Sequence, residues 1–281
     1  MVASGIFVTM RTPRSSVSAA PLVVCFSDVD GTLMDERERL IIDRDDAAGF
    51  ASFMELVLTS SRTLVELARI QRRLGLVAPL IGENGAVVGL PPRWRGGRSP
   101  GLRRVGGRSM QVIPLGQPAV TVRSRTRRCA RAASVRIVEQ RDLLPDRGRS
   151  LRRTHSVCVR NWRGPAAERF LAALRDEGLD ATRSGRWITI TAGADKGGGA
   201  REVLAMAVRR GAQFQWSAAI GNAENDAPLL AAADRRYAIR NPRRGHDPAL
   251  VRVPRVHALT LVGLAGWREA LGRILAQRRS Q

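Results

Sequence analysis

Lysine is nearly missing from this sequence of 281 residues: of its 47 lysine and arginine residues, only Lys196 is a lysine. Arginine therefore serves wherever a general positive charge is enough. Arginine carries a wide planar fork, whereas lysine carries a compact point charge on a thin stem. The single lysine indicates a position that needs the compact charge, such as a cradle for phosphate oxygens. For Lys196 alone, a chance survivor on a helix surface is an equally good interpretation.

Aromatic and acidic residues are also scarce. Aromatic side chains make up 4% of the chain, and 25 Asp and Glu against 47 Lys and Arg leave a net charge of +22. Residues 91–160 alone hold 18 arginines and three acidic residues. Such a charge favours nucleic-acid binding, but the arginines are scattered and the aromatic platforms on which bases stack are few. Compositional drift towards arginine, together with a few arginines that hold a small anionic substrate, therefore explains the charge better than a nucleic-acid partner does.

Cysteines are few, and long apolar runs are missing. Cys25, Cys129 and Cys158 lack the spacing of metal ligands, so we expect reduced, buried thiols in a cytoplasmic protein. No stretch reaches the length of a membrane span. Residues 1–20 mix Ser, Arg, Thr and Pro around a short apolar patch, which predicts a disordered leader. The oligomeric state stays open.

Two acidic residues follow an apolar segment near the start of the chain. Residues 22–26 (LVVCF) predict a strand buried on both faces, as in a parallel sheet. Asp28 and Asp30 come at its C-terminal end, where open α/β sheets bind their ligands. Two carboxylates this close favour a cation between them, and Mg²⁺ prefers carboxylates together with water and phosphate oxygens. The alternative for this segment alone is an acidic turn after a strand.

These residues resemble the first motif of the haloacid dehalogenase superfamily of phosphotransferases, an apolar strand followed by D-x-D-G-T. The resemblance continues in order along the chain. Ser60 ends a second apolar strand, Asp195-Lys196 opens a helix, and residues 220–229 (IGNAENDAPL) match G-D-x-x-N-D except at one position. The resemblance implies an α/β fold: a Rossmann-like doubly wound parallel sheet core with an inserted α+β cap domain. We expect the core in residues 21–89 and 186–281, and the cap in residues 90–185.

The apolar patterns predict the elements of this fold. Strands are expected at 22–27, 55–59, 80–81, 109–113, 119–122, 155–160, 187–191, 216–220 and 236–240. Helices are expected near 44–53, 63–74, 165–177, 196–209 and 262–277.

Three segments narrow the resemblance to one branch of the superfamily. Residues 60–63 (SSRT), 81–86 (IGENGA) and 225–230 (NDAPLL) look like mannosyl-3-phosphoglycerate phosphatase. Sugar phosphatases of the same cap class share much of this pattern, and related branches more often carry T-G-R where this chain has S-S-R. The resemblance implies a small phosphorylated, anionic sugar as substrate. It assigns substrate binding to Ser61, Arg62, Asn84 and Asn225.

The resemblance also implies catalytic roles. Asp28 would be the nucleophile that forms an aspartyl-phosphate, and Asp30 the general acid and base. Ser60 and Lys196 would hold the phosphoryl oxygens. Mg²⁺ and Lys196 would keep Asp28 ionised by lowering its pKa. The expected metal ligands are Asp28, Asp30, Asn222 and Asp226.

Position 222 departs from the family pattern. The family normally has an aspartate there as a direct Mg²⁺ ligand, whereas this chain has Asn222. An amide oxygen can still coordinate, but it brings no negative charge, so we expect weaker Mg²⁺ binding. Two hypotheses follow: a Mg²⁺-dependent phosphatase, or a catalytically weak member of the family that binds anions or interacts with other proteins.

Overall fold

The computed structural model describes residues 22–35, 37–94, 101–144, 151–212 and 214–279. The expected leader at 1–20 lies outside these residues. Among the residues described, no helix has the length and apolar character needed to span a membrane. Cys25, Cys129 and Cys158 are buried free thiols, as expected.

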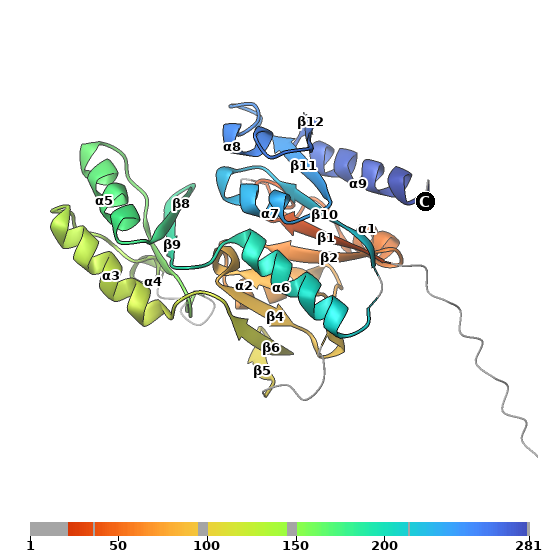
Figure 1. The fold of residues 1–281 in the computed structure, drawn as a ribbon, viewed down its shortest axis with the longest axis horizontal. Coiled ribbons are helices and arrows are strands. Elements are labelled where there is room, and N and C mark those ends of the chain that lie inside the picture. Colours follow the sequence, from red (N-terminus) through yellow and green to blue (C-terminus); the bar gives the residue numbers. More distant parts are fainter. Residues whose placement is uncertain (1–21, 36, 95–100, 145–150, 213, 280–281) are drawn as a thin grey trace, which may run out of the picture.

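A nine-stranded sheet forms the centre of the molecule, in the order β12-β11-β10-β1-β2-β3-β4-β6-β5 (Figure 1). From β12 to β3 the neighbours are parallel, and β4, β6 and β5 extend the sheet in antiparallel pairs. The strands are β1 (Leu22–Asp28), β2 (Met54–Thr59), β3 (Leu80–Gly82), β4 (Val87–Leu90), β5 (Arg103–Val105), β6 (Arg108–Pro114), β10 (Phe214–Gly221), β11 (Arg235–Arg240) and β12 (Val256–Val262).

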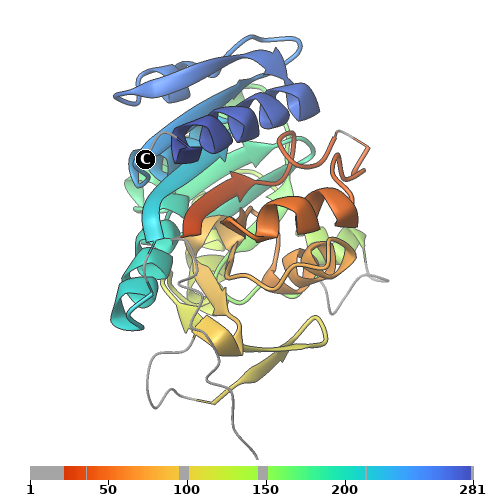
Figure 2. The same ribbon diagram turned by 90° about the vertical axis from the view of Figure 1, so that its right-hand side faces the viewer.

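Helices cover both faces of this sheet (Figure 2). One apolar cluster joins the sheet to α1 (Arg44–Ala51), α2 (Leu64–Arg73) and α9 (Gly263–Arg279). A second cluster joins the other face to α6 (Lys196–Arg209), α7 (Ala227–Ala231) and α8 (Pro248–Val251). In β1, Val23 and Cys25 belong to the first cluster, and Val24 and Phe26 to the second. Residues 22–26 of the strand are therefore all apolar, because both of its faces are buried there. These features confirm the expected doubly wound α/β core.

The chain order of the strands reverses beside β1. From β1 the chain continues to β2 and β3 on one side of the sheet, while β10, β11 and β12 lie on the other side. A crevice at such a switch point, outside the carboxyl ends of the strands, is the usual ligand site of an open α/β sheet. Asp28, the last residue of β1, stands at this point.

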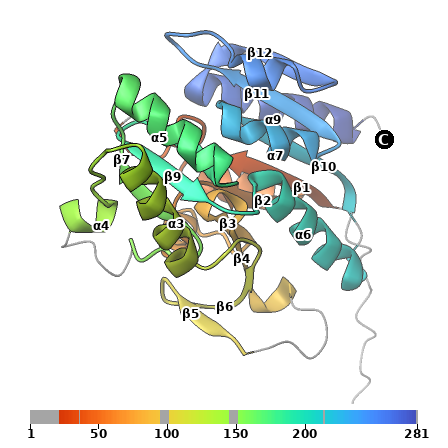
Figure 3. The same ribbon diagram turned by 60° about the vertical axis from the view of Figure 1, so that its left-hand side comes forward.

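A smaller α+β unit is inserted between β6 and α6 and lies beside the carboxyl ends of the parallel strands (Figures 1 and 3). Its sheet has the antiparallel order β7-β9-β8, and its apolar core includes Val122, Phe170 and Ile190. We call it the cap. Its elements are α3 (Ala119–Ala132), α4 (Gln140–Leu143), β7 (Val157–Arg160), α5 (Pro165–Asp176), β8 (Asp180–Ser184) and β9 (Trp187–Thr191).

The structure corrects three expectations. The strand expected at 119–122 is wrong, since these residues form the first turn of α3. The cap does not begin at residue 90, because β5 and β6 pair with β4 and extend the core sheet. Nor does it end at residue 185, because β9 is the middle strand of the cap sheet.

Candidate active site

A buried lysine joins two buried aspartates at the switch point. Lys196 Nζ lies 2.6 Å from Asp28 Oδ1 and 2.5 Å from Asp226 Oδ1. Lys196 is the first residue of α6, whose start is fixed by Asp195, because the Asp195 side chain accepts a hydrogen bond from Gly198 N at 2.6 Å. Lys196 is 1% exposed. It is therefore no chance survivor on a helix surface.

Burial and charge act on this cluster in opposite directions. Burial and the nearby Asp226 raise the pKa of Asp28 to about 7, although Lys196 lowers it. Burial lowers the pKa of Lys196, but the two carboxylates raise it more, so its ammonium group stays charged. Lys196 thus lowers the pKa of Asp28, as expected, but burial and the neighbouring carboxylate of Asp226 raise it more.

The second aspartate of the first motif is held by the loop that follows β2. Arg62 contacts the Asp30 carboxylate with two nitrogens, Nη2 to Oδ1 at 2.6 Å and Nε to Oδ2 at 3.1 Å. Ser60 Oγ donates to Asp30 Oδ2 at 3.0 Å. The structure thus brings these predicted residues together. It also gives Ser60 and Arg62 a shared partner, the Asp30 carboxylate, which the sequence did not indicate.

The loop after β10 brings Asn222 to the same place. Asp226 is fully buried, and its Oδ2 accepts hydrogen bonds from the backbone nitrogens of Asn222 and Ala223, at 2.9 and 3.1 Å. The Asn222 amide then lies against the backbone carbonyl of Asp30, with Nδ2 3.3 Å from that oxygen. Gly31 permits this approach, because a Cβ at this position would lie 2.3 Å from Asn222 Nδ2. The φ of Gly31 is +81°, a backbone conformation that glycine adopts readily.

Asn84 and Asn225 meet beside the lysine. Asn225 Nδ2 donates to Asn84 Oδ1 at 3.2 Å, while Asn84 Nδ2 is buried without a hydrogen-bond partner. Gly85 lets this loop lie against the start of α6, since a Cβ there would lie 1.8 Å from the Asp195 carbonyl oxygen. A buried amide without a partner is costly. Asn84 Nδ2 is therefore a donor available to a bound oxygen.

The oxygen atoms at this point fit a hard cation. Asp28 Oδ2 is buried without a hydrogen-bond partner, and the Asp30 carbonyl lies beside the Asn222 amide. Mg²⁺ is bound by such oxygens together with water and phosphate. Across the part of the chain that the structure describes, no three His, Cys, Asp or Glu side chains cluster as a metal site. Asp226, an expected ligand, already uses both carboxylate oxygens within the chain.

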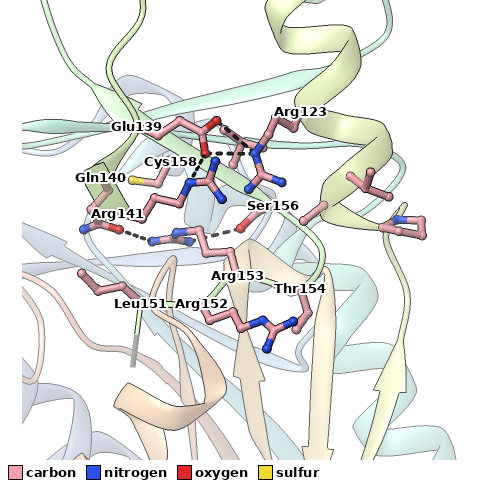
Figure 4. Close-up of a pocket in the computed structure, with 14 residues that line it drawn as sticks. Arg123, Glu139, Gln140, Arg141, Leu151, Arg152, Arg153, Thr154, Ser156 and Cys158 are labelled. Carbon is pink, nitrogen blue, oxygen red and sulfur yellow. Dashed lines mark hydrogen bonds and ion pairs between the residues drawn. The ribbon is translucent and has the colours of Figure 1, made fainter. Parts of the chain in front are cut away.

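The cap contributes an arginine-rich cavity of about 400 Å³ between α3, α4 and the start of β7 (Figure 4). Arg123 and Arg141 pair with the buried Glu139, and the exposed Arg152 also lines the cavity. Arg153 joins the cavity to residues 60–62, which we call the catalytic loop after the role predicted for Ser60, because its Nη1 donates to the Ser61 carbonyl at 2.8 Å. The backbone of Ser61, a predicted substrate-binding residue, therefore contacts the cap.

Two residues at this junction, Glu83 and Arg153, were not among the predicted site residues. Glu83 lies in the segment that suggested the branch of the family, but its partners are more than 70 positions away in the chain. Arg153 is one arginine among many. No local signal in the sequence distinguishes either residue, since their roles depend on where the cap docks.

Comparisons with known proteins agree with this fold. Residues 25–95 match the family of haloacid dehalogenase-like hydrolases. A protein from Thermoplasma acidophilum superposes with a TM-score of 0.65 at 15% identity, covering 90% of this chain and 98% of that one. The sucrose-phosphatase of a Synechocystis species gives 0.58 at 14% identity, covering 90% and 98%. A phosphatase of the HAD enzyme superfamily from Bacteroides thetaiotaomicron gives 0.55 at 19% identity, covering 95% and 98%.

The chain therefore has the fold of the haloacid dehalogenase-like hydrolases, and residues 25–95 carry their sequence pattern. The matched segment includes Asp28, Asp30 and Ser60, three of the four predicted catalytic residues. The fourth, Lys196, lies outside it and enters the site through the fold.

Proposed function

We propose that this chain is a Mg²⁺-dependent phosphatase that hydrolyses the phosphomonoester of a small anionic sugar in the cytoplasm. One observation carries the proposal: Lys196 is buried between Asp28 and Asp226 at the switch point, and one oxygen of Asp28 has no partner. Lysine, the compact cation, thus occurs once in the chain and stands where phosphoryl oxygens would bind.

The reaction in this proposal has two steps. A carboxylate oxygen of Asp28 attacks the phosphorus, the bond between phosphorus and the sugar oxygen breaks, and an aspartyl-phosphate forms. Asp30 gives a proton to the leaving sugar oxygen. In the second step Asp30 takes a proton from a water molecule whose oxygen attacks the phosphorus, the bond between phosphorus and the Asp28 oxygen breaks, inorganic phosphate leaves, and the Asp28 carboxylate is restored.

The other side chains position the reacting groups and balance charge. Lys196 faces the charge that spreads over the phosphoryl oxygens, and the free Nδ2 of Asn84 supplies a further donor. Ser60 and Arg62 hold Asp30 beside Asp28. Asp28, the Asp30 carbonyl and Asn222 would hold Mg²⁺, which when bound would draw negative charge from the phosphoryl group.

The cap cavity supports a substrate with a second anionic group. Arg152 and Arg153 line this cavity, and Arg153 reaches the catalytic loop. Arginine recognises carboxylates and phosphates through paired hydrogen bonds. Mannosyl-3-phosphoglycerate carries both a phosphate and a carboxylate, so it is the first candidate. The fold shared with a sucrose-phosphatase supports sugar phosphates as a class.

The test is a phosphate-release assay over mannosyl-3-phosphoglycerate, other glycosyl-phosphoglycerates and neutral sugar phosphates, with Mg²⁺ and with a chelator. We expect Mg²⁺-dependent turnover that is highest for a carboxylated substrate and is lost in Asp28→Asn. Turnover of neutral sugar phosphates alone would keep the phosphatase and reject mannosyl-3-phosphoglycerate. No turnover of any substrate would reject the enzyme.

A second function rests on Asn222. Its amide donates to the Asp30 carbonyl, where a ligand aspartate would instead share a cation with that oxygen. If this contact replaces the metal, the chain is a catalytically weak member that binds phosphorylated anions. Calorimetric binding of the same sugar phosphates without turnover would support this alternative.

A further inference from the structure

One buried carboxylate of the core accepts four hydrogen bonds, all from the cap. Glu83 Oε1 accepts from Thr154 N at 2.9 Å and Thr154 Oγ1 at 3.1 Å. Its Oε2 accepts from His155 N at 2.9 Å and Ser156 Oγ at 2.6 Å. Glu83 is 1% exposed. Hydrogen bonds from three successive cap residues thus take the place of hydrogen bonds from water at this carboxylate.

The backbone around Glu83 is fixed in the core. Glu83 N donates to the Arg62 carbonyl at 2.8 Å, and Asn84 N donates to the Ser60 carbonyl at 3.0 Å. Glu83 and Asn84 both have a left-handed backbone, with φ of 53° and 55°. Non-glycine residues in this conformation persist only where the surroundings over-determine them, and they gather at functional sites. The same short segment therefore contacts the catalytic loop with its backbone and the cap with its side chain.

A second contact crosses the junction close by. Arg153 directly precedes residues 154–156, and it donates to the Ser61 carbonyl and to Ser156 Oγ. Ser156 Oγ in turn donates to Glu83. Arg153, Ser156 and Glu83 thus form a chain of hydrogen bonds from the cap cavity into the core.

We propose that Glu83 is a positioning residue, which fastens segment 154–156 of the cap to the core and so sets where the cap cavity stands above the catalytic loop. Glu83 touches none of the reacting groups named above. It acts through Thr154, His155 and Ser156, and through the backbone of the neighbouring Asn84. Loss of its charge should loosen the cap at this segment while the core stays folded.

The experiment is hydrogen–deuterium exchange measured by mass spectrometry on Glu83→Gln in the full chain. Glutamine has the same shape, but its NH₂ group cannot accept, so at least one of the cap donors loses its partner. We expect the amides of residues 154–156 to exchange on the order of 10-fold faster, the loss expected for one hydrogen bond to a charged group. Exchange in β1, β2 and β10 should stay as in the wild type.

The matched control is Glu55→Gln. Glu55 is also buried, at 7% exposed, but it pairs with Arg93 and Trp94 within the core, away from the cap. This variant should leave exchange at 154–156 unchanged. Unchanged exchange at 154–156 in Glu83→Gln, or an equal rise there in both variants, would overturn the proposal.

Two further measurements keep the proposal testable. Should Glu83→Gln fail to fold, Ser156→Ala removes one bond from the cap side and should speed exchange at 154–156 in the same way. A kinetic comparison rests on the proposed function: in Glu83→Gln, KM for a sugar phosphate should rise on the order of 10-fold, with a smaller change for p-nitrophenyl phosphate. Exchange needs no turnover, so a chain without phosphatase activity would still decide the role of Glu83.

Discussion

Lys196→Arg is the substitution that tests the site most sharply, because it keeps the charge and changes only the shape. Lys196 Nζ lies 2.6 Å and 2.5 Å from two carboxylate oxygens in a place that is 1% exposed. The wider guanidinium cannot keep both distances without moving Asp28 or Asp226. A shift of about 1 Å in a reacting group costs about 100-fold in rate. Crowding in a close-packed site should also cost about 1–3 kcal/mol of unfolding free energy.

The assay is steady-state phosphate release at saturating Mg²⁺, together with thermal unfolding of the same samples. We expect kcat to fall roughly 100-fold or more while the protein remains folded. Arg201→Lys, the reverse exchange at an exposed position of the same helix, is the matched control and should keep wild-type kcat. Wild-type turnover by Lys196→Arg would refute the argument that this site requires the compact cation.

Three more predictions concern the site and the cap. Asp28→Asn should abolish phosphate release and keep the fold. Burial raises the pKa of Asp28 to about 7, from about 3.9 in the unfolded chain, so this group lowers the unfolding free energy of the metal-free wild type as pH rises from about 4 to 7. Thermal melts of the variant should lack this contribution to the pH-dependent loss of stability. Asn222→Asp should lower the melting temperature without Mg²⁺, because it places a carboxylate against the Asp30 carbonyl. It should also lower the Mg²⁺ concentration that gives half-maximal activity on the order of 10-fold, and equal Mg²⁺ midpoints would remove position 222 from the metal site. Arg152→Ala should raise KM roughly 10-fold for a carboxylated sugar phosphate and less for a neutral one, with the exposed Arg268→Ala as control.

Local patterns were enough to predict the core of the fold. The segment 22–26 is apolar at every position, and Val23 to Phe26 are buried on both faces of the sheet in the structure. The spacing of Ala200, Val203 and Ala207 likewise predicts a helix that packs on the sheet, as α6 does. These elements follow from the residues alone because each is decided by which side chains must be buried.

The cap was harder to predict because competing local signals meet there. Val120, Thr121 and Val122 are β-branched residues that favour a strand, yet they form the first turn of α3. Burial of Val122 and Cys129 at helical spacing outweighs that preference. The pairing of β4 with β6 is long-range, and nothing in either segment indicates its partner.

In the candidate site, the sequence predicts the residues but not the contacts between them. Asp28, Asp30 and Lys196 are recognisable from motifs, and the structure brings them together with Asn222 and Asp226. The contacts among them were not predictable: Arg62 on Asp30 and Glu83 on the cap join residues 32 and more than 70 positions apart. Such contacts depend on how loops meet at the sheet edge, which no local pattern encodes.

Chemical trapping can show whether Asp28 becomes phosphorylated during turnover. The protein is mixed with a phosphorylated sugar and Mg²⁺, quenched with borohydride, and digested for mass spectrometry. Borohydride reduces an acyl phosphate, so we expect a reduced side chain at Asp28 that depends on substrate and is missing in Asp28→Asn. Hydrolysis of the substrate with an unmodified Asp28, or with the modification at another carboxylate, would contradict it.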